Sequence, residues 1–136
     1  MLTHVLDTSA WLTHVFGEPG HEIVADLITD PAASLGISAV SLLELHARMK
    51  AVGALRLYSE VLNGYKEIFD LIIPADETIA IRATDIREVA SARVPAMDSL
   101  IAATAAANNA ILVHRDPHFQ TIPETQLQQL VLTGSK

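Results

Sequence analysis

Hydrophobic and polar positions alternate along the chain in two distinct patterns. Short apolar runs, which are typical of buried strands, occupy residues 3–7, 35–38, 71–73, 110–114 and, more weakly, 127–132. Apolar residues at the spacing of one helical face occupy residues 21–29, 55–69, 77–91 and 99–107. Two further helices are expected. One begins at Thr8 and Ser9, which suit its first turn, and the other is capped by Ser38 or Ser41 and ends near Gly53.

This order of elements predicts a single α/β domain over residues 1–136. Strands that are separated by helices need crossover connections, and such connections join parallel neighbours. No repeat, low-complexity tract or Gly/Ser linker divides the chain. We therefore expect a three-layer α/β/α sandwich, in which a mostly parallel central sheet is covered by helices on both faces.

The composition excludes several classes of protein. Half of the 136 residues are hydrophobic and 18% are charged, which excludes a disordered or fibrous chain. The absence of cysteine excludes a disulfide framework, a thiolate metal site and a cysteine nucleophile. The net charge of −7 argues against nonspecific binding to duplex nucleic acid through a broad basic face. The sequence shows no signal peptide and no apolar run of membrane length, so we expect a cytoplasmic protein without a membrane span.

Two aspartates are expected at the same edge of the sheet. Asp7 directly follows the first strand, and Asp116 follows the strand that ends at His114. Ligands of open parallel sheets bind beyond the carboxyl ends of the strands. Each aspartate also has a purely structural interpretation, Asp7 as the N-cap of the next helix and Asp116 in an Asp-Pro turn. Position alone leaves both interpretations open.

Glu44 and Asp98 are two further acids in apolar surroundings. Glu44 lies within the sequence SLLELHA, where burial of an unpaired charge would be costly. The alternative for Glu44 is a solvent-facing position between two apolar stripes. Asp98 opens the alanine-rich helix, where a first-turn carboxylate interacts favourably with the helix dipole and is often only structural.

Together these four carboxylates predict a cation site. Parallel strands bring Asp7 and Asp116 to one edge, and the neighbouring helices can bring Glu44 and Asp98 towards it. Carboxylates that lie within a few ångströms repel one another unless some are protonated or a cation is bound. Oxygen donors favour a hard ion such as Mg²⁺ or Mn²⁺ over zinc. These acids make up more than half of the net charge of −7, so much of the acidity belongs to the predicted site.

Other phosphate-dependent and metal-dependent classes lack the residues that they need. A phosphoaspartyl protein needs a late lysine, whereas the lysines here are Lys50, Lys66 and Lys136. The chain has no glycine-rich phosphate loop, and its six histidines show no HExxH spacing. The alternative that remains is a non-catalytic metal-binding or partner-binding module whose acids cap helices.

Four segments in series resemble a known family. They are LDTSAWL near the N-terminus, SLLEL around Glu44, MDSLIAATA around Asp98 and ILVHRDPHF around Asp116. In this order and at roughly this spacing they resemble the PIN domain, most closely the VapC-type toxins of bacterial or archaeal toxin–antitoxin pairs. The resemblance spans nearly the whole chain. It implies a parallel sheet between layers of helices and an endoribonuclease that depends on Mg²⁺ or Mn²⁺.

The resemblance also assigns roles to residues. The acids that match the family's catalytic and metal-holding positions are Asp7, Glu44, Asp98 and Asp116. A hydroxyl from Ser9 or Thr8 matches the polar group that orders the metal site. The implied reaction is in-line attack of a metal-activated water on an RNA phosphodiester. The implied partners are a VapB-type antitoxin, which inserts a basic side chain near the acids, and a second copy of the chain in a homodimer.

One position departs from the pattern of the family. Many members have a further acid just before the final phenylalanine, and here that position is His118. The number of metal ions is therefore left open, since a histidine can ligate through nitrogen or contact a substrate phosphate. Arg115 is adjacent to Asp116 and can contact phosphate, with an exposed loop arginine as the alternative. The expected substrate-binding residues are thus Ser9, Arg115 and His118.

Overall fold

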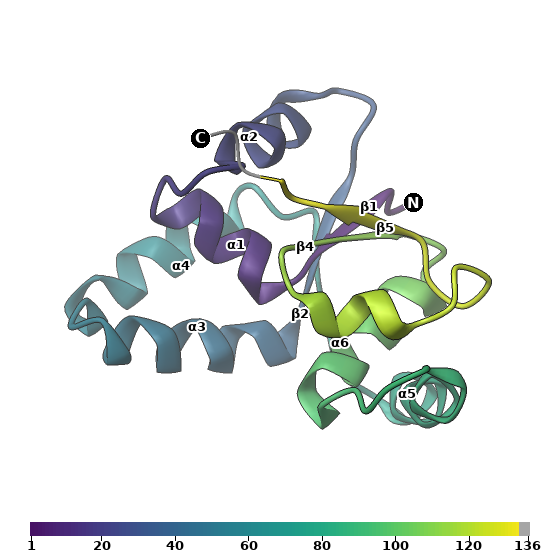
Figure 1. Cartoon of the computed structure of the whole chain (residues 1–136). Coiled ribbons are helices and arrows are strands. Elements are labelled where there is room, and N and C mark those ends of the chain that lie inside the picture. The colour runs from purple at the N-terminus through teal and green to yellow at the C-terminus, as the bar shows by residue number, and fades with distance from the viewer. Residues whose placement is uncertain (134–136) are drawn as a thin grey trace.

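Five short parallel strands form one sheet in the computed structural model, which describes residues 1–133 (Figure 1). The strands are β1 (His4–Leu6), β2 (Leu35–Ser38), β3 (Leu71–Ile73), β4 (Ile111–His114) and β5 (Gln129–Val131). Their order across the sheet is β3-β2-β1-β4-β5, and all four neighbouring pairs are parallel. This confirms the expected parallel sheet and places β1 at its centre.

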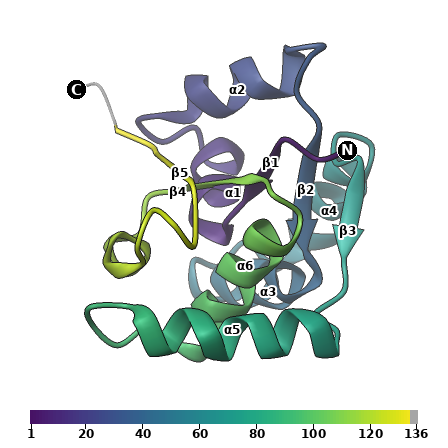
Figure 2. The same cartoon turned by 90° about the vertical axis from the view of Figure 1, so that its right-hand side faces the viewer.

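The helices cover both faces of the sheet, as expected. They are α1 (Thr8–Val15), α2 (His21–Thr29), α3 (Ala39–Ala51), α4 (Tyr58–Lys66), α5 (Glu77–Val89) and α6 (Ala96–Ala107), with short 3₁₀ turns η1 (Leu55–Leu57) and η2 (Pro117–Thr121). One hydrophobic core joins α1, α2, α3 and α4 to the sheet, and a second joins α5, α6 and η2 to its other face (Figures 1 and 2).

Alternation of side chains along each strand produces these two cores. In β1, Val5 belongs to the core beneath α5 and α6, whereas Leu6 belongs to the core beneath α1 and α3. Leu112 and Val113 of β4 divide in the same way. All four side chains are completely buried, as expected of central strands whose two faces are both covered.

Small residues let α6 lie close to the sheet. Ala102, Ala103 and Ala105 are fully buried, and their methyl groups pack in the same core as Val5 and Leu112. Alanine also has the highest intrinsic helix propensity. The alanine-rich segment therefore fixes the position of α6 and, with it, that of Asp98 in its first turn.

Several element boundaries differ from the sequence-based expectations. The helix α1 begins at Thr8, as expected, and its N-cap is Asp7, whose carboxylate accepts the Ser9 backbone N–H, so Thr8 and Ser9 lie in the first turn without capping it. Ser38, one of the two expected residues, caps α3. The helix expected over residues 55–69 begins instead as the 3₁₀ turn η1, and α4 ends at Lys66. Within residues 1–133, no helix has the length and apolar character needed to cross a membrane.

Candidate metal centre

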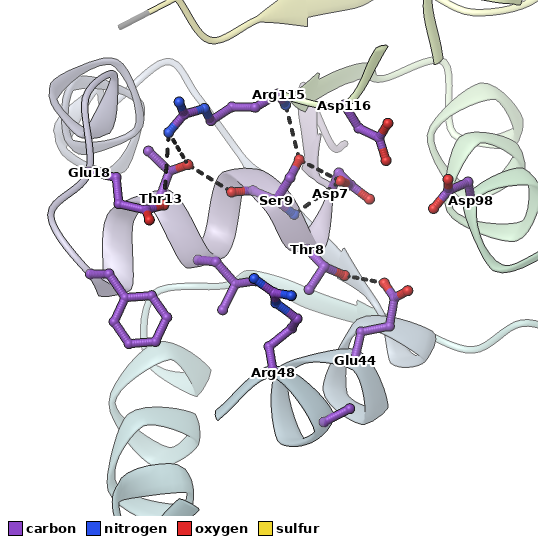
Figure 3. A pocket seen from close by; sticks show the side chains of 13 residues that line it. Asp7, Thr8, Ser9, Thr13, Glu18, Glu44, Arg48, Asp98, Arg115 and Asp116 are labelled. Carbon is purple, nitrogen blue, oxygen red and sulfur yellow. Dashed lines mark hydrogen bonds and ion pairs between the residues drawn. The ribbon is translucent and has the colours of Figure 1, made fainter. Parts of the chain in front are cut away.

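A cleft of about 490 Å³ opens at the carboxyl ends of β1 and β4, between α1, α3 and α6 (Figure 3). The residues that line it are Asp7, Thr8, Ser9, Leu12, Thr13, Phe16, Glu18, Glu44, Ala47, Arg48, Asp98, Arg115 and Asp116. All four acids from the sequence analysis are among them, and each comes from a different segment of the chain. The parallel sheet thus brings together carboxylates that are up to 109 residues apart in sequence.

Asp7 is the most deeply buried acid of the cleft, with 3% of its surface exposed. Its Oδ2 atom accepts hydrogen bonds from the Ser9 backbone N–H at 3.0 Å and from the Ser9 hydroxyl at 2.6 Å. Burial raises the pKa of Asp7 to about 7, although the Ser9 hydrogen bonds lower it, and the negative charges of Asp98 and Glu44 raise it further. The residue therefore acts as a helix cap and also faces the other acids of the cleft.

Glu44 extends from α3 into the cleft and caps no helix (Figure 3). The Thr8 hydroxyl donates a 2.5 Å hydrogen bond to Glu44 Oε1, and the Thr8 and Ser41 hydroxyls lie 2.9 Å apart. Leu45 beside Glu44 is fully buried, whereas Leu43 is 64% exposed, so Glu44 lies on the border between the core and the surface. A solvent-facing role between two apolar stripes does not account for this arrangement.

Asp98 lies in the first turn of α6 without capping it. Pro95 occupies the N-cap position, and no side chain makes a capping hydrogen bond there. Burial raises the pKa of Asp98 to about 6, and the charges of Asp116 and Glu44 raise it further, against a lowering by His118. The repulsion predicted from the sequence is therefore present in the folded chain.

Asp116 is held by two hydrogen bonds, one to its carboxylate and one from its backbone N–H. Its Oδ1 atom accepts the His118 backbone N–H at 2.9 Å, which caps η2, and its own N–H donates to His114 Nδ1 at 3.1 Å. His114 is completely buried, and its Nε2 atom lies 2.7 Å from Gln129 Oε1. Because Nδ1 accepts a backbone N–H, the ring proton is on Nε2 and donates to Gln129.

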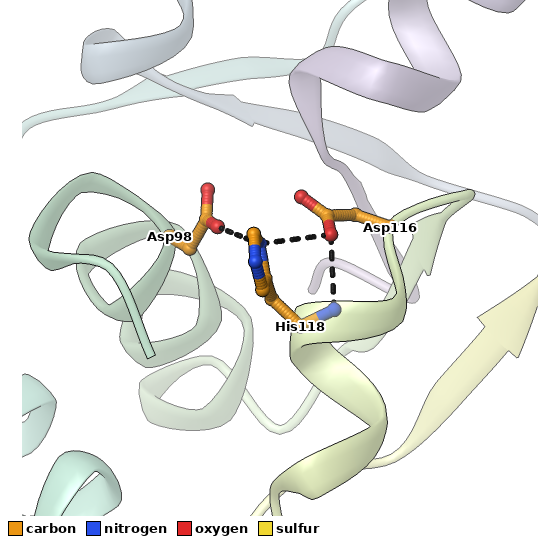
Figure 4. A group of neighbouring side chains, drawn as sticks. All are labelled: Asp98, Asp116 and His118. Atoms are coloured by element: carbon orange, nitrogen blue, oxygen red, sulfur yellow. Dashed lines mark hydrogen bonds and ion pairs between the residues drawn. The ribbon is translucent and has the colours of Figure 1, made fainter. Parts of the chain in front are cut away.

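His118 lies between two of the acids (Figure 4). Its Nδ1 atom is 3.2 Å from Asp98 Oδ2 and 3.1 Å from Asp116 Oδ1, and about half of its side chain is exposed. Among the described residues, these three side chains are the group whose ligand atoms all lie within 4.8 Å of one another. Asp7 and Glu44 line the same cleft but are not part of this tightest group.

Arg115 is held by Ser9, which the sequence indicates, and by Thr13 and Glu18, which it does not. Its guanidinium Nη1 donates to the Thr13 hydroxyl at 3.4 Å and lies 3.8 Å from Glu18 Oε1, while its backbone N–H donates to Ser9 Oγ at 3.0 Å (Figure 3). Thr13 and Glu18 lie about a hundred residues earlier in the chain, so no local motif indicates their contact with Arg115. Arg48 adds a second guanidinium to the lining of the cleft.

The chemistry of the donor set fits a divalent cation. Carboxylate oxygens from four segments face one cleft, and two of them have pKa values raised by burial and by their neighbours. A bound cation stabilises the ionised forms of such groups and removes their mutual repulsion. The lining also holds hydroxyl groups and two guanidiniums, which are suitable for orienting carboxylates and for binding an anionic ligand.

The model of the PIN domain family matches residues 4–124, nearly the whole chain. The chain belongs to the PIN domain family. The matched region includes the four acids, Ser9, Arg115 and His118. No curated protein matches the chain in a sequence search.

Several solved structures share the PIN fold of this chain. VapBC2 from Rickettsia felis bound to a promoter DNA fragment has a chain that is 19% identical, with a TM-score of 0.79 over 97% of this chain and 100% of that chain. DNA-bound VapBC from Salmonella typhimurium has a chain that is 23% identical, with a TM-score of 0.78 over 98% of this chain and 100% of that chain. FitAcB from Neisseria gonorrhoeae is 25% identical, with a TM-score of 0.68 over 94% and 96%. The similarity to structures of VapBC complexes agrees with the resemblance noted in the sequence.

Proposed function

We propose that this PIN domain is a divalent-metal-dependent endoribonuclease and the toxin of a toxin–antitoxin pair. The observation that supports this most strongly is the convergence of four acids from separate segments on one cleft: Asp7, Glu44, Asp98 and Asp116. The PIN family match and the similarity of the fold to VapBC structures support the same reaction class.

The acids of the cleft would hold Mg²⁺ or Mn²⁺, and the bound ion supplies an activated water and neutralises charge at the phosphate. Asp7, Asp98 and Asp116 would hold the ion directly or through water. Ser9 keeps the Asp7 carboxylate directed into the cleft through two hydrogen bonds. Glu44, which the Thr8 hydroxyl fixes, either ligates the ion or orients the attacking water.

The substrate in this proposal is RNA, which the lining of the cleft binds beside the acids. Arg115 is oriented by Thr13 and Glu18, and Arg48 faces the same space from α3. Their guanidiniums provide donors for phosphate oxygens, while the acids need a cation before a phosphodiester can approach. Ser9 and His118 are further polar groups close to the reacting phosphate.

The partners in this proposal are a VapB-type antitoxin and a second copy of the chain, all in the cytoplasm. A basic side chain of the antitoxin would pair with the acids of the cleft and block the metal centre. Apolar side chains available for interfaces are exposed on α3 and in the turns that follow it: Leu43, Val52, Leu55 and Leu57. Similar solved structures include VapBC-5 from Mycobacterium tuberculosis, a member of the VapBC family of toxin–antitoxin systems, and two VapBC structures bound to DNA.

The non-catalytic module remains a second candidate, because Asp7 and Asp116 do cap α1 and η2. Two observations weigh against it. Glu44 caps nothing, and Asp98 makes no capping hydrogen bond, yet both line the cleft. Burial and crowding also raise the pKa values of Asp7 and Asp98, which is unusual for acids that only cap helices.

A cleavage assay tests the proposal. The purified chain should cut a pool of single-stranded RNA when Mn²⁺ or Mg²⁺ is added and should stop when the ion is chelated. Glu44→Gln should lower the rate at least about a hundredfold, as is typical when a group that handles a proton or a metal is lost, whereas the exposed Glu60→Gln control should cleave normally. Expression without a partner should arrest growth for the wild type and for Glu60→Gln, but not for Glu44→Gln. Metal-independent cleavage by both variants, or normal growth together with intact RNA, would contradict the proposal.

A further inference from the structure

The side chain of His118 lies where it could ligate a metal ion together with two of the acids. Its Nδ1 atom lies between Asp98 Oδ2 at 3.2 Å and Asp116 Oδ1 at 3.1 Å, which come from α6 and from the start of η2 (Figure 4). The backbone N–H of His118 donates to Asp116 Oδ1 at 2.9 Å, and this hydrogen bond fixes the backbone from which the imidazole extends. These three side chains offer two oxygens and one nitrogen that all lie within 4.8 Å of one another.

The chemistry of the nitrogen donor bears on the choice of ion. Mg²⁺ prefers oxygen ligands in nearly ideal octahedral geometry and keeps several waters. Imidazole nitrogen suits the first-row transition metals better, and Mn²⁺ accepts carboxylates and water as well. Carboxylates suit both ions, so an imidazole in place of one oxygen donor shifts the preference of the set towards Mn²⁺ and away from Mg²⁺.

We propose that His118 is a metal ligand that makes this centre selective for Mn²⁺ over Mg²⁺. The inference rests on the metal-dependent activity proposed above and deepens it by naming the ion. Neutral imidazole is the ligand form, so His118 would hold the ion through the lone pair of Nδ1. Asp98 and Asp116 would supply the neighbouring oxygen ligands.

Two other roles for His118 make different predictions. If the ring acts as an internal cation that pairs Asp98 with Asp116, it competes with the ion, and its removal tightens the binding of both metals. If the ring contacts only substrate phosphate, its removal weakens RNA binding and leaves metal affinity unchanged. Metal affinity measured without RNA therefore separates the three roles.

The experiment measures Kd for Mn²⁺ and for Mg²⁺ by calorimetry on the intact metal-free chain, with electron paramagnetic resonance of free Mn²⁺ as a second readout. The variants are His118→Ala, which removes the nitrogen, and His118→Asp, which offers an oxygen in its place. His21→Ala is the matched control, because His21 also lies beside a carboxylate, at 3.4 Å from Glu22, but is not part of the group formed by Asp98, Asp116 and His118. Circular dichroism confirms that each variant is folded.

We expect the wild type and His21→Ala to bind Mn²⁺ at least about tenfold more tightly than Mg²⁺, and both His118 variants to lose most of this preference. His118→Asp should also bind Mg²⁺ more tightly than His118→Ala does. An unchanged preference in the folded variants, or tighter binding of both ions by His118→Ala, overturns the inference and leaves the nuclease proposal standing. Binding of neither ion by the wild type overturns the metal-dependent activity as well.

Discussion

The Asp7 carboxylate caps a helix and also faces the other acids of the cleft, and these roles place opposite demands on its charge. The Ser9 hydrogen bonds favour the ionised form, whereas burial disfavours it more strongly and raises its pKa to about 7. Asp98 shows the same conflict with a pKa of about 6. In the metal-free chain, both groups therefore keep a proton at pH values where a free aspartate has lost it.

The raised pKa values predict a pH-dependent stability of the metal-free chain. Between about pH 4 and pH 7, the folded state binds more protons than the unfolded state, so the free energy of unfolding falls as the pH rises and stays low above pH 7. Asp7→Asn keeps a good N-cap but cannot titrate, so it should flatten this decline. Urea unfolding at a series of pH values in a chelator measures the slope. The exposed Asp26→Asn control should keep the slope of the wild type, and the same slope in Asp7→Asn would refute the explanation.

Asp98 provides a test of crowding among the acids. Asp98→Asn should raise the stability of the metal-free chain at pH 7.5 by on the order of 1 kcal/mol, because repulsion from Asp116 and Glu44 disappears. The variant should also lose most of the stabilisation that Mn²⁺ gives the wild type, which is about 2.7 kcal/mol at a hundred times Kd. Thermal unfolding with and without the ion measures both effects.

The exposed Asp85→Asn serves as the control for this experiment and should behave like the wild type. If Asp98 were only a favourable first-turn charge, its replacement would instead lower stability by up to about 1 kcal/mol, with no change in the response to metal.

Among single residues, the four acids could be predicted from the sequence to share one cleft, because each lies next to a strand end or among apolar residues. Their convergence agrees with the parallel topology. The contacts of Thr13 and Glu18 could not be predicted from the sequence. Both residues contact the guanidinium of Arg115, which lies in a loop far away in the sequence. The position of His118 between two acids also depends on how η2 turns after Asp116.

At the scale of elements, the connection from β4 to η2 is the part of the fold that most directly positions the site. His114 at the end of β4 accepts the Asp116 N–H and donates to Gln129 of β5, whose amide in turn donates to the Phe119 carbonyl. Burial lowers the pKa of His114, so the ring stays neutral and keeps this pattern of donor and acceptor. The buried imidazole of His114 thereby connects β4, the turn η2 and the edge strand β5.

This network predicts an effect of His114 on both stability and metal binding. His114→Leu leaves the Asp116 N–H and the Gln129 amide without their partner, which should lower the free energy of unfolding by about 1–3 kcal/mol. It should also weaken Mn²⁺ binding, because Asp116 loses its anchor. Urea unfolding and calorimetry measure the two effects, with the exposed His46→Ala as control. A variant as stable as the wild type would show that the network has no structural importance.

Element types followed from the sequence more reliably than their ends did. The expected helix over residues 21–29 and the strands over 35–38 and 71–73 have these bounds in the structure. The expected start of α1 at Thr8 is also found. Asp, Thr and Ser are all good caps, and the extended backbone of Asp7 identifies it as the cap. The 3₁₀ start before α4 depends on tertiary packing that helical periodicity does not encode.

For the molecule as a whole, the net charge of −7 is compatible with the proposed nucleic-acid substrate, because the four acids that meet in the cleft account for more than half of that charge. A bound cation offsets this local charge, and Arg115 and Arg48 then provide the nearest positive groups. The layered parallel fold could be predicted from alternating strands and helices. The order of the strands could not, since it depends on which apolar faces pack together.

The central claim is that the cleft holds a divalent cation between acids from separate segments. Anomalous diffraction at the manganese absorption edge, from crystals grown with Mn²⁺, tests it most directly. We expect the strongest peak in the cleft, in contact with carboxylate oxygens of Asp98 and Asp116 and facing Asp7 and Glu44. A well-diffracting crystal with manganese peaks only elsewhere on the protein, or with the four carboxylates turned away from any ion, would contradict the account.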